Sequence, residues 1–264
     1  MTPYWVWLLG VSGLFVVLER LTAARREQKV LRPQIWNDLF YLGFNGHFYA
    51  VLTAGIVIVV ETTTLSIIPE PLRSDLRILQ GRQFLVQFFA YFVIADFLQW
   101  LVHNLLHRVP ILWQFHKIHH SAHEMDWAVN FRFHWMELVV YKSLLYLPLL
   151  VLGGDGEPLM AVFVFGTAWG HFNHANTKIK IGVLGYIFNS PSMHLWHHDS
   201  TGEGGTSKNF GIVLSCWDFL FRTAFWPRGR DPKRLGFPRD DSVPDHILGQ
   251  ELHPLMSRST LDQD

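Results

Sequence analysis

The stretch HNLLHRVPILWQFHKIHH at residues 103–120 constrains this chain more than any other, because it holds five of the fifteen histidines. The first two histidines are four residues apart, and the last three stand at i, i+3 and i+4. On a helix, each group would project its imidazoles to one side. The two groups consist of His103, His107, His116, His119 and His120.

The i, i+3, i+4 pattern returns late in the chain as HLWHH, with His194, His197 and His198. Neutral imidazole is the commonest side-chain ligand of metals in proteins, and three or four ligands complete the protein shell of one ion. Eight or more converging histidines therefore predict two metal ions. The spacing does not choose the metal, because imidazole sites serve zinc, copper, iron and nickel alike.

The composition is typical of a membrane protein, with 49% hydrophobic and only 17% charged residues. The formal net charge is zero, whereas a nucleic-acid-binding protein would normally carry a basic excess. The single cysteine, Cys216, excludes an internal disulfide and thiolate-rich zinc or iron–sulfur sites. Any metal is therefore expected to be held by nitrogen, with or without oxygen ligands.

Three apolar segments are long enough to cross a membrane as helices, at residues 4–18, 39–60 and 84–107. The first segment lacks a positively charged leader and a cleavage site, which favours a retained span over a signal peptide. The loop between the first two segments is rich in arginine and lysine. The positive-inside rule therefore places that loop in the cytoplasm.

The third segment carries a polar stripe, in which Asp96, Gln99, His103 and His107 stand at i, i+3, i+7 and i+11. A charge such as Asp96 would cost about 2.5–3.5 kcal/mol if it faced lipid, so the stripe is expected to face the bundle or a wet cavity. Asp96 is either a residue of that cavity that supports the ligands or a structural hydrogen-bond acceptor. Pro110 is expected to end the helix.

Residues 137–152 and 158–171 are apolar and flank the polar turn GGDGE, which predicts a helical hairpin. Such a hairpin would return HLWHH to the membrane side on which the third span ends. Residues 227–264 are rich in Pro, Arg and Asp and predict a loosely ordered cytoplasmic tail.

We therefore predict an all-α integral membrane bundle of four to five spans, with a histidine-rich helical cap on the cytoplasmic side that holds a dimetal site. N-terminal spans would occupy residues 1–83, a catalytic core residues 84–226 and the tail residues 227–264.

Further residues are candidates for the site. His174 lies where the returning helix should reach the other histidines, and a ligand is the favoured interpretation. His171, one turn earlier, is either a ligand or a core histidine. His134 is favoured as a residue that supports the ligands, and Glu137, one turn later, is the carboxylate that would orient it.

The motifs HNLLHR, LWQFHKIHHS, RFHWME, HAN, SPSMHLWHHD, KNFG and CWDFLF lie between about residues 84 and 225. In this region the chain resembles the fatty acid hydroxylase/sterol desaturase superfamily of membrane non-haem di-iron oxygenases. The resemblance implies two irons and an all-histidine ligand set. The implied ligands are His103, His107, His116, His119, His120, His174, His194, His197 and His198.

The resemblance also implies an O2-dependent oxidoreductase that hydroxylates or desaturates an unactivated C–H position of a sterol, fatty-acyl chain, sphingolipid or ether lipid. The sequence shows no dinucleotide-binding GxGxxG fingerprint and no haem or iron–sulfur cysteine motif. A separate electron-transfer protein or a pterin is therefore expected as donor. Arg228, Arg230, Lys233 and Arg234 are either an ordinary basic flank or a docking surface for that partner or for anionic headgroups.

Two other classes remain open from the residues alone. A zinc-dependent membrane hydrolase of the ceramidase type would need one metal with three protein ligands and an open water position. A metal transporter would place its ligands along a path near the membrane midplane. Clustering at one interface favours the oxygenase, and the bacterial inner membrane is the expected location rather than the endoplasmic reticulum.

Overall fold

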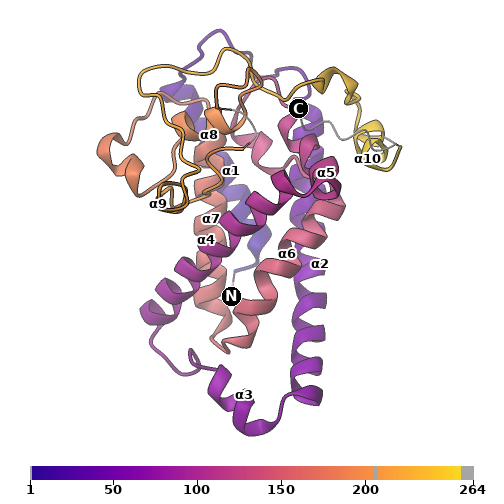
Figure 1. The fold of residues 1–264 in the computed structure, drawn as a ribbon, viewed down its shortest axis with the longest axis vertical. Helices are drawn as coiled ribbons and strands as arrows, with labels where there is room; N and C mark the ends of the chain where they lie inside the picture. The colour runs from indigo at the N-terminus through magenta and orange to yellow at the C-terminus, as the bar shows by residue number, and fades with distance from the viewer. Residues whose placement is uncertain (1, 205–206, 257–264) are drawn as a thin grey trace.

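The computed structural model describes residues 2–204 and 207–256, apart from the side chains of residues 49, 64 and 65. Within this part the chain is helical, and its β-structure is limited to two isolated bridges, Phe188 with Leu214 and Asp199 with Leu235. Figure 1 shows long helices that run side by side, with most of the short helices gathered at one end. The predicted all-α membrane bundle is confirmed.

The long helices of the described chain are α1 (Tyr4–Thr22), α2 (Ile35–Ile67), α4 (Phe84–Arg108), α6 (Trp135–Val151) and α7 (Gly156–His174). Among the described residues, three helices are long and apolar enough to cross a membrane: α1, α2 over Ile35–Thr63, and α4. The α6 helix has 17 residues, which span about 26 Å against a hydrocarbon core of roughly 30 Å. Fewer helices than the expected four to five therefore qualify as spans.

The short helices α5 (Pro110–His120), α8 (Pro191–His197), α9 (Cys216–Leu220) and α10 (Ile247–Met256) lie at one end of the bundle (Figure 1). The α3 helix (Glu70–Leu76) lies at the other end. Three 3-10 turns complete the elements: η1 (Trp127–Phe131), η2 (Gly182–Tyr186) and η3 (Asp240–Ser242).

Pro110 separates α4 from α5, as the sequence predicts. The preceding residue, Val109, is extended, with φ −94° and ψ 113°, because a proline ring disfavours the helical conformation in the residue before it. Pro110 then occupies the first turn of α5, where its missing N–H costs nothing. The bend lets α5 pack back against α4.

The predicted hairpin of α6 and α7 is present, and its turn is clamped to the start of α4. The Gly154 N–H donates to the Tyr91 hydroxyl at 2.8 Å, and the Asp155 N–H donates to Gln87 Oε1 at 2.6 Å. A Cβ on Gly154 would lie 2.5 Å from the Tyr91 hydroxyl oxygen, so only glycine allows this approach. The clamp holds the end of α6 and the start of α7 against the start of α4, at the end of these helices away from the histidines.

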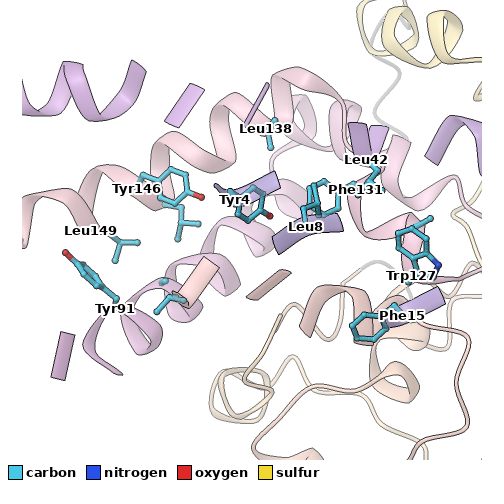
Figure 2. Close-up of a cluster of buried hydrophobic side chains, with 14 of the residues drawn as sticks. Tyr4, Leu8, Phe15, Leu42, Tyr91, Trp127, Phe131, Leu138, Tyr146 and Leu149 are labelled. Carbon is cyan, nitrogen blue, oxygen red and sulfur yellow. The ribbon is translucent and has the colours of Figure 1, made fainter. Parts of the chain in front are cut away.

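The main apolar core lies between α1, η1, α4, α6 and α7. Figure 2 shows Tyr4, Leu8 and Phe15 of α1 in one cluster with Trp127 and Phe131 of η1. Because lipid tails are as apolar as these side chains, close van der Waals packing favours this arrangement of the spanning helices. The opposite face of α1 is also apolar and exposed, as expected of a helix in lipid.

A buried ionic network holds the α1–α2 loop against the segment that precedes α6. Arg32 donates to Asp38 at 2.6 Å and to both oxygens of Asp126 at 2.6 and 2.7 Å, and Arg132 also donates to Asp38. All four side chains are buried. Buried charges are tolerated only when they are paired, and each of these four side chains has an oppositely charged partner.

The C-terminal segment corrects one prediction. Residues 227–264 were expected to be loosely ordered, but the described part, up to residue 256, packs on the cap. Phe237 and Val243 are buried in a cluster with Trp113 and Ile118 of α5. Two widely spaced apolar side chains are therefore enough to attach this polar segment to the cap. The division into residues 1–83, 84–226 and 227–264 stays a prediction, and residues 257–264 lie outside the described chain.

Candidate metal centre

Nine histidines converge at the end of the bundle where α4 and α7 terminate. The α4 helix supplies two of them, α5 three, α7 one, and α8 with its C-cap residue three. All nine are buried. They are the predicted ligands His103, His107, His116, His119, His120, His174, His194, His197 and His198.

The nine histidines form two groups, and within each group one nitrogen of every residue lies within 4.8 Å of the others. The first group consists of His103, His107, His116, His120 and His197. The second group consists of His119, His174, His194 and His198. Within the described chain these are the only such groups of three or more potential ligands.

The two HxxHH motifs are divided between the groups in opposite ways. In α5, His116 and His120 enter the first group, and His119 enters the second. In α8, the i and i+4 histidines enter the second group, and His197 enters the first. Neighbours on a helix point about 100° apart. The two adjacent histidines at the end of each motif therefore enter different groups. The groups touch where His120 stacks on His198, with a centroid distance of 4.3 Å.

The second group already has the spacing of ligands around one ion. The Nε2 atoms of His174 and His119 are 3.2 Å apart, and those of His194 and His174 are 3.0 Å apart. The Nε2 atoms of His198 and His194 are also 3.2 Å apart. Nitrogens bound at about 2.0–2.1 Å to a single ion lie roughly 2.9–3.4 Å from one another. The group can therefore hold a metal ion with little rearrangement.

Four imidazoles are oriented by an Nδ1–H that donates to a fixed acceptor. His103 donates to the Phe210 carbonyl at 2.8 Å, and His197 donates to the Lys208 carbonyl at 2.6 Å. His174 donates to the Gly170 carbonyl at 2.7 Å. The fourth, His116, is 2.8 Å from a carboxylate, described below. A carbonyl can only accept, so the first three rings carry their proton on Nδ1 and present the Nε2 lone pair.

Several buried ring nitrogens have no hydrogen-bond partner among the described residues. They include both nitrogens of His107 and of His120, and Nε2 of His116 and His197. A buried polar atom without a partner costs about 1–3 kcal/mol. Such a concentration of unpartnered lone pairs in one place fits a metal site and not a hydrogen-bonded core.

Burial keeps these imidazoles in the neutral form that binds metals. Desolvation lowers the pKa of His116 to about 3. Desolvation, followed by repulsion from neighbouring imidazoles, lowers the pKa of the other α5 and α8 histidines well below 6.5; these are His119, His120, His194, His197 and His198. Their lone pairs are therefore free at neutral pH.

Glu137 and His134 do not form the predicted pair. Glu137 Oε1 instead accepts from Nδ1 of His116 at 2.8 Å, so the carboxylate supports a histidine of the first group. His134 lies outside both groups: its Nδ1 accepts from the Met136 N–H at 3.1 Å, and its Nε2 donates to the Glu251 carbonyl at 2.9 Å. The first turn of α6 turns these two side chains in different directions.

His171 and Asp96 also lie outside both groups. His171 is hydrogen-bonded on both ring nitrogens, to Ser12 at 3.1 Å and to Asn130 at 2.8 Å, and so links α1 to the η1 turn. Asp96 accepts from the N–H groups of Val213 and Leu214 at 2.9 and 3.1 Å. It thereby joins the segment after α8 to α4. Of the two roles considered for Asp96, this is the structural hydrogen-bond acceptor.

Sequence reasoning missed the supports that hold residues 208–211. Asp218 accepts from the N–H groups of Phe210 and Gly211 at 2.9 and 2.8 Å. These bonds position the Phe210 carbonyl, which accepts from His103. Asn209 has a positive φ of 57° and donates to the Met193 carbonyl at 2.9 Å. The KNFG and CWDFLF motifs contain these residues, but only the fold shows what they contact.

A cavity of about 110 Å³ lies inside the bundle, lined mainly by α6, α7 and η1, with Gln99 of α4. Its walls are mainly apolar and include Leu138, Leu145 and Phe163. Glu137 and Gly170 also line it, and these two residues accept hydrogen bonds from His116 and His174. One residue of the cavity wall therefore contacts each histidine group, through the Glu137 carboxylate and the Gly170 carbonyl.

The basic residues after Trp226 are largely engaged within the chain. The Arg228 guanidinium lies over the rings of Trp226 and Tyr186, 4.8 and 5.0 Å from their centroids. Arg230 is 3.1 Å from Glu203, and Arg234 is 2.5 Å from Asp240. Lys233 is exposed. These internal contacts favour the interpretation of an ordinary basic flank.

An apolar helical bundle that gathers nine buried histidines at one end defines a histidine-rich integral membrane protein. The family model described as fatty acid hydroxylase matches residues 88–223, which is slightly more than half of the 264 residues. The chain belongs to the fatty acid hydroxylase family, as its motifs implied.

Several relatives match half of the chain or slightly more, and the chain spans only 30–39% of their own length. The chain is 35% identical over 133 residues to an ornithine lipid hydroxylase of Rhizobium tropici, covering 50% of this chain and 39% of that protein. It is 26% identical over 160 residues to an alkylglycerol monooxygenase of Caenorhabditis elegans, covering 59% of this chain and 30% of that protein. The corresponding human protein is 27% identical over 135 residues, covering 51% and 30%. No solved structure matches the chain.

Proposed function

We propose that the protein is an O2-dependent membrane oxidoreductase that hydroxylates an unactivated C–H position of a lipid, with two non-haem irons held by the nine histidines. The main support is the position of an apolar cavity beside two groups of buried imidazoles, in which several ring nitrogens have no hydrogen-bond partner among the described residues. The names of the relatives, a lipid hydroxylase and two monooxygenases, favour hydroxylation over desaturation.

In this proposal each histidine group holds one iron. Bound iron would supply the reduction of O2 and the oxidation of the C–H bond. The chain's own part is orientation: the carbonyls of Phe210 and Lys208 hold two imidazoles of the first group, and the Gly170 carbonyl holds one of the second. The apolar walls of the cavity would hold a lipid chain and exclude water from the reacting carbon.

The electrons are proposed to come from a separate electron-transfer protein or a pterin. The lipid substrate would enter from the surrounding bilayer. We place the histidine groups on the cytoplasmic side of a bacterial inner membrane, because the basic α1–α2 loop lies at the same end of the bundle as the cap (Figure 1).

Metal content and product labelling test the proposal. Full-length protein purified in detergent should contain two irons per chain by inductively coupled plasma mass spectrometry. Cells with the gene, grown under 18O2, should accumulate a lipid that carries one labelled oxygen. His198→Ala should abolish this product, whereas His123→Ala, a substitution of a half-exposed histidine outside both groups, should not.

Other outcomes would replace the proposal. A lipid that loses two hydrogens without gaining label would identify a desaturase. One zinc per chain, with lipid cleavage that does not need O2, would identify a hydrolase of the ceramidase type. Metal-dependent uptake into vesicles, without any oxidised lipid, would identify a transporter.

A further inference from the structure

A second cavity, of about 560 Å³, opens where α1 ends, and none of the nine histidines lines it. Its walls come from the end of α1, the α1–α2 loop, the start of α2 and the segment after α7. The Lys178 N–H donates to the Thr22 carbonyl at 2.8 Å, which joins two of these walls. Because α1 is a candidate span, the cavity lies where that helix leaves the membrane.

The cavity carries more positive than negative charge. Its lining includes two carboxylates, and the fold uses both. Asp126 forms an ion pair with Arg32, with 2.6 Å between Oδ2 and Nε. Glu19 accepts the N–H groups of Trp127 and Asn176 at 2.9 and 2.8 Å, and so joins α1 to η1 and to the segment after α7. Both carboxylates also attract Arg25, so their charge acts on that residue and not on the exposed cations of the lining.

The cations of the lining are Arg20, Arg25, Arg26, Lys29 and Lys178. Arg25 is held in place, because its guanidinium donates to the Met125 carbonyl at 2.7 Å and to Gln28 at 3.0 Å. The other four are exposed and form no ion pair with any described residue. An anion that entered the cavity would meet four unpaired positive charges.

One side of the same cavity is apolar. Val16 and Leu21 of α1 line it and are 40% and 75% exposed, and Leu31 of the following loop is 64% exposed. Exposed aliphatic side chains would serve no purpose around a small soluble anion. They suit a ligand that places an acyl chain beside α1 and an anionic group at the end of this helix.

We propose that this cavity binds an anionic phospholipid, with the phosphate among Arg20, Arg26, Lys29 and Lys178 and an acyl chain along Val16 and Leu21. The site is separate from the cavity beside Glu137, so this lipid is not the oxidised substrate. The loop that lines this cavity is joined to the segment after α7, because the Arg25 N–H donates to Asn176 Oδ1 at 2.9 Å.

Native mass spectrometry of the full-length protein in detergent tests the site, with phosphatidylglycerol as the anionic probe and phosphatidylcholine as the neutral one. We expect preferential binding of phosphatidylglycerol. The double variant Arg26→Gln, Lys29→Gln removes two exposed cations and should weaken this binding roughly thirtyfold. Its binding of phosphatidylcholine should not change. Lipid binding is measured without turnover, so the result does not depend on the proposed oxidation.

A matched control carries Arg228→Gln and Lys233→Gln, which remove the same charge elsewhere on the cap and should leave the affinity for phosphatidylglycerol unchanged. Equal weakening by both double variants would show general surface attraction and overturn the proposal. So would equal affinity of the unaltered protein for both lipids. Displacement of phosphatidylglycerol by millimolar inorganic phosphate would identify a soluble anion site instead.

Discussion

The two histidine groups use the same HxxHH motif but differ in how their rings are held. In the first group, three of the five histidines have an Nδ1 partner outside the group: Phe210, Glu137 and Lys208. In the second group only one of the four has such a partner, the Gly170 carbonyl that receives His174. The Nδ1 atoms of the other three have none among the described residues.

This difference indicates how each group reaches a geometry that can bind metal. Most of the first group is arranged by the protein, because acceptors on α6 and on residues 208–210 fix three of its five rings before any ion binds. The second group has short Nε2 separations but few external supports, so a bound ion would itself fix three of its rings. Outer partners of metal-binding histidines typically change affinity or activity by about 10–100-fold.

The largest effect is expected from the loss of a histidine that links α8 to the first group. His197→Ala should reduce lipid oxidation by more than about a hundredfold, because even the loss of an outer partner can reach that value. Labelled product and iron content measure the effect. His123→Ala is the control, since this residue contacts Asp240 and belongs to neither group. Full activity of His197→Ala would show that the first group is not part of the site.

A smaller effect is expected from the carboxylate that supports His116. Glu137→Leu removes the acceptor of its Nδ1–H and should cost about 10–100-fold in activity, with iron lost from the first group. Glu137→Gln keeps an oxygen acceptor and should recover part of the loss. His134→Gln is the matched control on the same helix turn, and it should leave the iron content unchanged. Iron loss in His134→Gln equal to that in Glu137→Leu would contradict the assignment.

Local patterns explain what could be predicted from the sequence. The spacing of the histidines and the apolar runs indicated membrane helices and the convergence of all nine residues, because a helix face depends only on spacing along the chain. The GGDGE turn likewise predicted the hairpin. The buried anchors Phe237 and Val243 stand too far apart for any periodicity, so the packing of the C-terminal segment was missed.

The division of the histidines into two groups could not be predicted from one motif. His119 and His120 are neighbours in α5, and the position of α8 decides which ring meets which partner. The pairing of His116 with Glu137 has the same origin, because it depends on how α6 crosses α5. Asp218 of α9 accepts from Trp100 of α4 and from the Phe210 N–H. These contacts form only because α9 folds back against α4, from which it is far away in the sequence.

Removal of metal compares the two groups directly. If each holds one iron, a chelator should extract the two irons in two phases of equal size. The faster phase is expected from the second group, because fewer external hydrogen bonds hold its rings. Iron that remains on the protein is measured over time by mass spectrometry. In Glu137→Leu the slow phase should approach the fast one. A single phase in the unaltered protein would mean that the supports of the first group do not affect metal retention.

The smallest effect is expected from Asp218, which positions the segment whose carbonyls accept from His103 and His197. Asp218 is buried and accepts from the N–H groups of Phe210 and Gly211. Asp218→Asn should weaken these charge-assisted hydrogen bonds, destabilise the protein by about 1 kcal/mol and speed the slow phase of iron loss a few-fold. Asp199→Asn is the counterpart beside the second group, where the carboxylate receives the Gly204 N–H at 3.0 Å. It should leave the slow phase unchanged. If both variants speed the slow phase equally, residues 208–211 are not a specific support of the first group.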